Sequence, residues 1–365
     1  MKYDYLVVGA GLYGATFACQ MQKAGKKCLV IDKRPHIAGN AYTERRENID
    51  IHMYGAKIFH TRHRIVWDFV NHYAIFNNYH HKVKATFKDK VYSLPINLNT
   101  FYQFWGCKTP GEAKSRLDEA RSKYPMATDN LQNWSLGQLG DEIYYTLYHG
   151  YTKKQWCREP SEVPAGIIKR LPIRFTWDDD YFDDPYQGIP VDGYTAMVAQ
   201  MLEGIDVQLG TDFFFFGDWR KIADKLIFTG PIDQFCDYKF GALEYLSLQF
   251  VHHHVSVEDY QGISVMNFTD EKFPFTRTIE HKHFTNAKSK TTFVTQEYPQ
   301  KYSPGVEPYY PVNTQKNQDL YLKYKEEVEK EPDVFLGGRL GTFSYINMDQ
   351  TVLLALEAAK LMESV

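Results

Sequence analysis

The sequence predicts an α/β fold built on a parallel sheet, and three features of the chain indicate it. Residues 3–8 form an apolar run that ends in a glycine-rich turn, and a helical pattern and a second apolar run at 28–31 follow. This order of strand, turn, helix and strand is typical of the first βαβ unit of a dinucleotide-binding fold. Residues 97–148 read mostly as helices, and residues 243–298 hold several β-rich runs. Because the sequence contains no internal repeat and no low-complexity linker, we expect its domains to be interleaved.

The composition narrows the class of protein. At about 150 residues per domain, 365 residues predict two to three domains. No run of 18 apolar residues exists, so we expect no membrane insertion. The 42 basic and 45 acidic residues give no basic excess, so we expect no nucleic-acid partner. Five cysteines without a C-x-x-C pair argue against a disulfide framework and a zinc ribbon, and with no signal sequence evident we expect a cytoplasmic protein.

The rest of the chain reads as an ordered series of elements. The pattern predicts a hairpin over 80–94, helices over 97–148, an irregular exposed segment over 172–190, a helix over 193–203, a strand ending at 230, β-rich runs over 243–298, an amphipathic helix over 316–330, a strand at 334–336 and a helix from about 349.

The glycine turn predicts a dinucleotide site. Gly9, Gly11 and Gly14 follow a strand and precede a helix, where the backbone can approach a pyrophosphate at the helix N-terminus. Asp32 closes the second strand, which suits a carboxylate that accepts hydrogen bonds from an adenosine ribose. The competing interpretation is a chance glycine turn in an unrelated α/β protein.

Three recurrences favour FAD over NAD. Arg34 and the pair Gly39-Asn40 come just beyond Asp32, similar to the basic-plus-glycine segment of flavoproteins. Two later strand ends, at Thr229 and near Arg339, resemble further cofactor contacts of FAD enzymes. The last helix begins near Met348 and would direct its positive end at the flavin. The predicted cofactor-binding residues are Gly9, Gly11, Gly14, Asp32, Lys33, Gly39, Asn40, Thr229, Gly230, Arg339 and Met348.

Short strings along the whole chain resemble one family. They are YGAKIFHT (54–61), YSLPINL (92–98), GYTKKQW (150–156), RLPIRF (170–175), TRTIEHKHF (276–284), PYYP (308–311) and GRLGT (338–342). In this order they resemble the bacterial UDP-galactopyranose mutases, flavoenzymes that interconvert the pyranose and furanose forms of a nucleotide-linked sugar.

The resemblance implies three intermixed domains. They are an FAD-binding Rossmann-like domain over 1–80, 191–238 and 332–365, an inserted helical bundle over 97–150, and an inserted antiparallel β-sheet layer over 81–96, 151–190 and 239–331. It also implies an isomerase of polysaccharide biosynthesis that forms a homodimer.

The same resemblance assigns roles in the site. Arg170 and Arg277 match two arginines that hold the substrate diphosphate, and guanidinium groups give forked, charge-assisted hydrogen bonds that lysine cannot copy. For either arginine alone, the competing interpretation is a surface salt bridge. His60 matches a catalytic residue that lies against the flavin. The substrate-binding matches are Tyr151 and Trp156 toward the uridine, Tyr181, Tyr310 and Tyr345 toward the diphosphate, and Thr152, Lys57, His81 and Asn347 elsewhere in the site.

The family also implies the route of the reaction. Reduced flavin would attack the anomeric carbon through N5, form a covalent flavin–sugar intermediate, and allow the ring to open and reclose without net redox change. Lys57 beside the flavin would favour its anionic reduced form.

Three positions differ from the galactose-specific pattern. Lys57 stands where those enzymes usually carry His, His81 where they carry Asn, and Asn347 where they carry Asp. We therefore expect UDP-galactose not to be the best substrate. UDP-N-acetylgalactosamine, a nucleotide-linked fucose and a nucleotide other than uridine stay open.

Two charged or histidine-rich runs are interpreted as structural. The aspartates between 178 and 184 read as a solvated face of a mobile segment without a catalytic role. Residues 252–254 are three histidines, but neighbours on a strand point to opposite faces, so we expect no metal site.

Two other functions remain as alternatives. An FAD-dependent oxidoreductase of the amine-oxidase type would oxidise its substrate. A non-catalytic protein that binds nucleotide sugars would leave every sugar unchanged.

Overall fold

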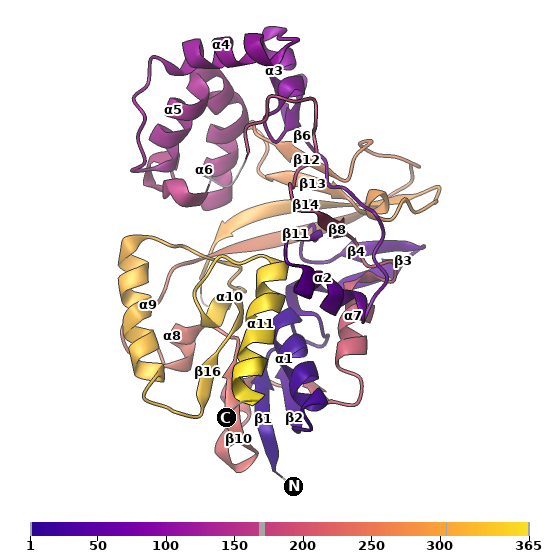
Figure 1. Cartoon of the computed structure of the whole chain (residues 1–365), viewed down its shortest axis with the longest axis vertical. Helices are drawn as coiled ribbons and strands as arrows, with labels where there is room; N and C mark the ends of the chain where they lie inside the picture. Colours follow the sequence, from indigo (N-terminus) through magenta and orange to yellow (C-terminus); the bar gives the residue numbers. More distant parts are fainter. Residues whose placement is uncertain (1, 168–171, 304, 364–365) are drawn as a thin grey trace.

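The computed structural model describes residues 2–167, 172–303 and 305–363. It stacks three layers along its longest axis, with helices α3–α6 at the top, a seven-stranded sheet across the middle and a parallel sheet below (Figure 1). How these layers divide into domains stays a prediction. In the described part of the chain, no helix combines the length and apolar character needed to cross a membrane.

The lower layer is a five-stranded parallel sheet in the order β16-β10-β1-β2-β9. Its strands are β1 (Tyr3–Val8), β2 (Cys28–Asp32), β9 (Asp206–Leu209), β10 (Ala223–Phe228) and β16 (Val334–Leu336). The central strands are near-continuous apolar runs because both faces are covered. Helices α1 (Leu12–Lys23) and α11 (Met348–Glu363) pack side by side on one face, and α9 (Gln315–Val328) packs with α8 (Ile232–Phe235). The predicted parallel sheet is confirmed.

The middle layer is a seven-stranded sheet in the order β15-β11-β14-β13-β12-β6-β7. The strands are β6 (Val83–Phe87), β7 (Lys90–Leu94), β11 (Tyr245–Val255), β12 (Val265–Phe268), β13 (Arg277–Glu280), β14 (Thr292–Lys301) and β15 (Tyr310–Pro311). It is mixed rather than wholly antiparallel, because the hairpin β6–β7 joins the later strands through a parallel β12–β6 pair. This pairing brings residues near 81–85 beside residues 265–280.

The upper layer is helical, and local sequence signals set its helix starts. The helices are α3 (Leu98–Trp105), α4 (Pro110–Arg121), α5 (Leu131–Ile143), a π-helical turn (Tyr144–His149) and α6 (Gly150–Trp156). Asn97, Thr109 and Asn130 cap α3, α4 and α5 through side-chain oxygens that accept backbone N–H groups. These caps fix where α3, α4 and α5 begin. Helix α6, which follows them, packs against β14 of the middle sheet.

Shorter elements complete the fold. They are β3 (Thr43–Arg46) paired with β4 (Ile49–His52), β5 (Phe59–Thr61) paired with β8 (Tyr186–Gly188), and the helices α2 (Arg64–Asn71), α7 (Gly193–Met201) and α10 (Gly338–Gly341).

Candidate active site

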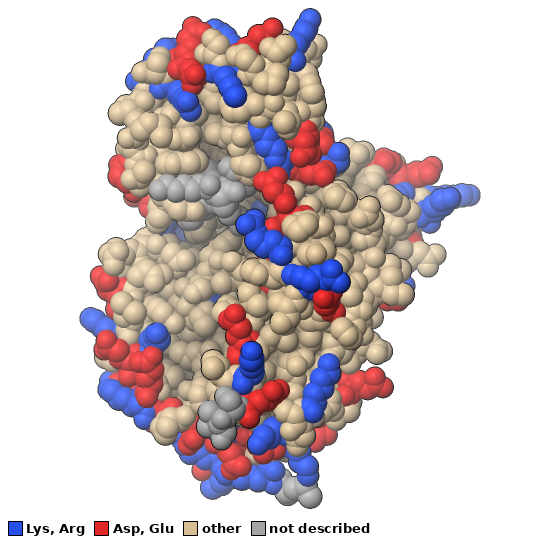
Figure 2. Space-filling view, viewed as in Figure 1, with Lys and Arg blue, Asp and Glu red and all other residues tan. Residues whose placement is uncertain are grey.

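One cavity of about 680 Å³ lies between the carboxyl ends of β1, β2 and β10 and the middle sheet. On the face drawn in Figure 2, the surface is hollowed between the upper helices and the lower part of the molecule. Every residue predicted above to act in catalysis or to bind cofactor or substrate lines this cavity, apart from Arg170, which lies outside the described residues. The roles of these residues stay predictions.

The glycine turn leaves room for a ligand at one end of the cavity. Gly9 has a φ of +109°, and a Cβ there would lie 2.1 Å from Oγ1 of Thr229. A Cβ on Gly14 would lie 2.0 Å from the carbonyl oxygen of Gly9. Gly11 is the N-cap of α1, and no side chain caps this helix. The first N–H groups of α1 are therefore available to a phosphate.

Asp32 holds the next strand end against this turn. Its two carboxylate oxygens accept the backbone N–H groups of Ala10 at 2.8 Å and of Arg34 at 2.9 Å. The Arg34 guanidinium donates to Oδ1 of Asn40 at 2.9 Å and lies 4.6 Å from the ring centroid of Tyr54. Because carboxylate oxygens have further lone pairs, Asp32 can also accept a ribose hydroxyl. These residues fit the adenosine and pyrophosphate of a dinucleotide.

A cation and stacked tyrosines lie farther along the cavity. The Arg339 guanidinium lies 5.0 Å from the ring centroid of Tyr310 and 5.4 Å from that of Tyr345. The two tyrosine rings stack with centroids 5.1 Å apart. Met348, which lines the cavity, begins α11. Its helix N-terminus and Arg339 suit an electron-rich ring, as the cofactor prediction requires.

Lys57 is a half-buried lysine on which the charges of Arg34 and Arg339 both act. Its Nζ donates to the carbonyl oxygen of Tyr54 at 2.6 Å and to the hydroxyl of Tyr309 at 2.8 Å. Burial lowers the pKa of Lys57 to about 7, and the nearby positive charge of Arg339 acts in the same direction. An anion bound in the cavity would reverse this effect and favour the charged ammonium.

Arg277 begins β13 and reaches the cavity beside Tyr151, whose hydroxyl it contacts. Burial would lower the pKa of Arg277, but the Glu297 carboxylate and surrounding tyrosines raise it well above its ordinary value. Nε of Arg277 lies 3.3 Å from Oε1 of Glu297, as an ion pair whose angle does not make a hydrogen bond. Arg277 is therefore a permanent cation, and its Nε has no hydrogen-bond partner among the described residues.

The far end of the cavity carries aromatic rings and unpaired amides. Tyr151, Thr152 and Trp156 all come from α6. Oε1 of Gln155 and Oδ1 of Asn267 are buried there without a hydrogen-bond partner in the described chain. Flat rings with free amide oxygens suit a nucleobase that offers N–H donors.

His60 and His81 both line the cavity, and the ring of each stacks with the ring of Phe182. The rings of His60 and Phe182 lie 3.6 Å apart at 12°, and those of His81 and Phe182 lie 5.8 Å apart at 26°. Nδ1 of His81 is bonded to the hydroxyl of Tyr79 at 3.1 Å. Burial lowers the pKa of His81 to about 3, and the positive charge of Arg277 acts in the same direction. This ring is therefore neutral at physiological pH.

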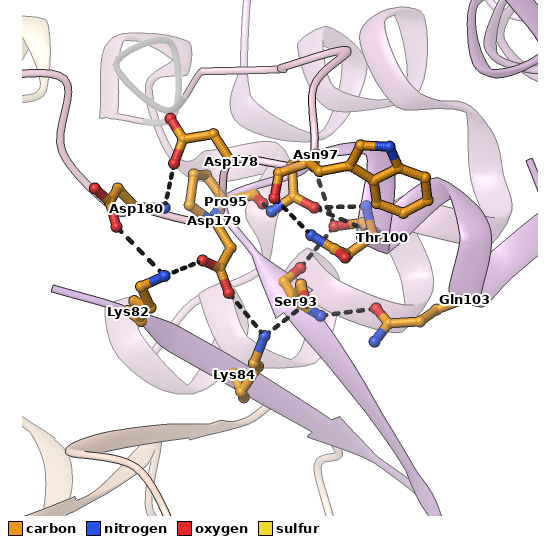
Figure 3. Close-up of polar contacts among 12 residues, drawn as sticks. Lys82, Lys84, Ser93, Pro95, Asn97, Thr100, Gln103, Asp178, Asp179 and Asp180 are labelled. Atoms are coloured by element: carbon orange, nitrogen blue, oxygen red, sulfur yellow. Dashed lines mark hydrogen bonds and ion pairs between the residues drawn. The ribbon is translucent and has the colours of Figure 1, made fainter. Parts of the chain in front are cut away.

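The segment with the aspartates is only in part the solvated face that we expected, because Asp178 and Asp183 are exposed, whereas Asp179, Asp180 and Asp184 are half-buried. Asp179 accepts from Lys82 at 2.6 Å and from Lys84 at 3.2 Å (Figure 3). Oδ2 of Asp180 lies 3.0 Å from Nδ1 of His80. Asp183 pairs with Arg174, and Asp184 pairs with His60 and Arg62. Most of these cations, from His60 to Lys84, are about 100 or more residues away in sequence, and this long-range pairing carries no local sequence signal. Arg174 is the local partner, nine residues before Asp183.

The histidines of β11 do not converge on one point. His252 bonds Thr295, His253 bonds Gln296 and His254 pairs with Glu47. Elsewhere, Asp259, Glu280 and His283 bring ligand-type atoms within 4.8 Å of one another. Glu280 accepts hydrogen bonds from the backbone N–H groups of Tyr260 and Gln261, so both oxygens of its carboxylate are already bonded to this loop.

The sequence prediction missed three residues that line the cavity, Gln155, Asn267 and Asp184, and also Glu297, the ion-pair partner of Arg277. Gln155 lies inside the string 150–156 and could have been found there. Asn267 and Glu297 reach Arg277 through strand pairing, since β13 pairs with both β12 and β14. Asp184 was hidden in the aspartate run.

Comparison with known proteins gives a consistent result. The family model described as UDP-galactopyranose mutase matches residues 146–345, and a model described as NAD(P)-binding Rossmann-like domain matches residues 7–73. The dTDP-fucopyranose mutase of Escherichia coli is 38% identical over 371 residues, covering 98% of this chain and 97% of the relative. A probable UDP-galactopyranose mutase of Klebsiella pneumoniae is also 38% identical, over 361 residues that cover 98% and 94%.

Solved structures agree on the fold. A crystal structure of reduced UDP-galactopyranose mutase matches with a TM-score of 0.77 at 16% identity, covering 99% of this chain and 95% of that one. An engineered putrescine oxidase matches with a TM-score of 0.64 at 13% identity, covering both chains fully. At these identities the likeness concerns the fold alone.

Proposed function

The chain belongs to the UDP-galactopyranose mutase family, and on this premise we propose that it uses reduced FAD to interconvert the pyranose and furanose forms of a nucleotide-linked hexose. It is an isomerase that acts as a nucleotide-sugar pyranose–furanose mutase. The observation that carries the finer proposal is one continuous cavity, which joins a dinucleotide cradle at Gly9–Asp32 to the half-buried cation Arg277.

The cofactor end supports FAD through three kinds of contact. The glycine turn and the uncapped start of α1 would hold the pyrophosphate, and Asp32 would hold the ribose. Arg339 and the start of α11 would lie toward the flavin. Reduced flavin, when bound, supplies a nucleophilic N5 for the anomeric carbon of the sugar. Denatured protein should release free FAD, and recovery of NAD or of no cofactor would contradict this assignment.

The substrate end supports a nucleoside diphosphate. Arg277 would bind the diphosphate oxygens, which meet its unpartnered Nε. Tyr181, Tyr310 and Tyr345 would donate their hydroxyl groups to the same oxygens. Arg170, which lies outside the described residues, is proposed as the second arginine on the basis of its family string alone.

Two observations bear on the identity of the sugar. The two relatives named above are equally identical to this chain, and they act on different nucleotide sugars by name. Lys57, His81 and Asn347 all line the cavity, so the three departures from the galactose pattern lie where they can contact a ligand. We propose that dTDP-fucose or another hexose nucleotide is a better substrate than UDP-galactose.

Product analysis of a panel of nucleotide sugars tests the proposal. The dithionite-reduced protein should convert at least one pyranose to its furanose, with a higher kcat/KM for a sugar other than UDP-galactose. Net oxidation of the substrate would favour the oxidoreductase alternative, and tight binding without conversion would favour a non-catalytic protein.

A further inference from the structure

The imidazole of His60 is fixed at the wall of the cavity by a carboxylate. Its Nδ1 lies 2.6 Å from Oδ2 of Asp184, and the two side chains are only 12% and 14% exposed. His60 lies on β5, whose backbone pairs with β8 just beyond Asp184. Gln187 of β8 donates to the carbonyl oxygens of Phe182 and Asp184, which holds the turn between them. Strand pairing and side-chain bonds together fix the position of the ring.

The carboxylate of Asp184 also determines which ring nitrogen of His60 is free to contact a ligand. A carboxylate only accepts hydrogen bonds, so Nδ1 of His60 carries a proton and donates it to Asp184. Nε2 makes no hydrogen bond with a described residue, and the side chain lines the cavity. Stacking on Phe182 prevents the ring from turning away. Nε2 is therefore the atom that His60 presents to a ligand.

The reaction needs one proton carrier near the sugar. In ring opening, the C1–O5 bond breaks, its electron pair stays on O5, and O5 takes up a proton. In ring closure, an electron pair of O4 forms the C1–O4 bond, and O4 loses its proton. The electron demand at C1 between these steps is met by the electron pair that reduced flavin supplies under the proposed function. One proton moves from O4 to O5 overall, so a single group can donate it and take it back.

We propose that Nε2 of His60 carries this proton, as a catalytic acid and base, with Asp184 as its positioning residue. The inference rests on the proposed function. The cycle begins with the imidazolium form of His60, which donates to O5, and the neutral ring then accepts the proton of O4. Asp184 stabilises the imidazolium through its negative charge and holds Nδ1, so that proton exchange occurs at Nε2 alone.

The groups around His60 fit this role, and those around His81 do not. Arg62, Asp183 and Asp184 are the charged groups that line the cavity nearest to His60, and Arg62 donates to the second oxygen of Asp184 at 3.2 Å. Among the described residues, His81, across Phe182, has no carboxylate partner, and the positive charges that act on it are those of Arg277 and, when protonated, His60. A ring that stays neutral near a cation cannot begin as an acid.

The test separates cleavage of the anomeric bond from ring contraction. Cleavage and re-formation of the C1–O bond move an oxygen-18 label from the bridging position of the diphosphate to its non-bridging positions. Ring contraction is measured separately, as furanose formed. General acid–base catalysis contributes roughly 10²–10⁴-fold, so His60→Gln should lower furanose formation by about 100-fold or more. Label exchange should stay within several-fold of wild type.

Asp184→Asn is a second test, and its expected effect on turnover is smaller. An amide keeps the shape but loses the charge that stabilises the imidazolium, so we expect a lower kcat with KM nearly unchanged. His80 and Asp180 form a matched control, because they make the same Nδ1–carboxylate contact at 3.0 Å but do not line the cavity. His80→Gln and Asp180→Asn should leave kcat within about twofold.

The outcomes distinguish the two proposals. If the wild-type protein shows neither label exchange nor furanose, the proposed function fails. If it shows both, and His60→Gln loses them in equal proportion or loses neither, the role of His60 is refuted. An unchanged kcat in Asp184→Asn would refute the role of Asp184.

Discussion

The two ends of the cavity are built in different ways. At the end formed by the glycine turn, the turn, α1 and Asp32 belong to one continuous stretch, and backbone groups make the decisive contacts. At the end formed by His60, ion pairs hold the segment around Asp179 and Asp184, and His60 and Asp184 are 124 positions apart. A site built from backbone tolerates almost no added atom. A site built from paired side chains can lose one pair and keep its shape.

The largest expected effect is therefore at the glycine turn. Gly14→Ala places a Cβ 2.0 Å from the carbonyl oxygen of Gly9, and backbone must move to admit it. We expect the variant to be purified without flavin and to melt several degrees lower, as measured by flavin absorbance and thermal unfolding. Gly111→Ala is the control, since a Cβ there meets nothing within 4 Å. Normal flavin content in Gly14→Ala would mean that the cofactor does not lie on this turn.

The next effect concerns the half-buried cation. Arg277→Ala removes charge-assisted hydrogen bonds worth about 1.5–3 kcal/mol each, so kcat/KM should fall tenfold or more while flavin content stays normal. Arg277→Lys should recover little, because lysine lacks the planar fork. Arg116, which pairs with Glu119 on the surface of α4, provides a control substitution to Ala. Near-normal turnover in Arg277→Ala would remove this residue from the site.

The difference between the two ends also explains what the sequence could predict. The parallel sheet and glycine turn follow from local patterns, as the runs at 3–8 and 28–31 illustrate, and both are confirmed. The parallel β12–β6 pair and the burial of Asp184 depend on contacts between distant segments. The interpretation of the aspartate run as solvated holds for Asp178 and Asp183 but not for Asp179 and Asp184, whose cationic partners are distant in sequence.

A pH-dependent effect is expected at Lys57, which lies between the two ends. Its pKa is lowered from 10.5 to about 7 by burial, so between pH 7 and pH 10 the unfolded chain binds a proton that the folded chain has released. Stability therefore rises with pH in this window. The melting temperature of the cofactor-free wild type, minus that of Lys57→Met, should increase from about pH 7 to pH 9. Parallel curves, as expected for the exposed Lys316→Met control, would contradict the burial of an ionisable amine.

The smallest effect is expected in the ion pairs of the aspartate segment. Partly exposed pairs contribute about 0–1 kcal/mol, and Asp179 has two lysine partners, Lys82 and Lys84 (Figure 3). Asp179→Asn should lower the free energy of unfolding by no more than about 1 kcal/mol, and the loss should shrink at high salt. A loss of several kcal/mol would show that this segment is as intolerant as the glycine turn.

The central claim is that one cavity holds both a flavin and a nucleotide sugar and isomerises the sugar without net electron transfer. The most direct test compares furanose formation by the oxidised and the dithionite-reduced protein, with the consumed reductant measured in the same sample. We predict turnover only in the reduced protein, with many molecules of furanose formed per molecule of reductant consumed. Equal rates in both redox states, or one reductant consumed for each product, would contradict the account.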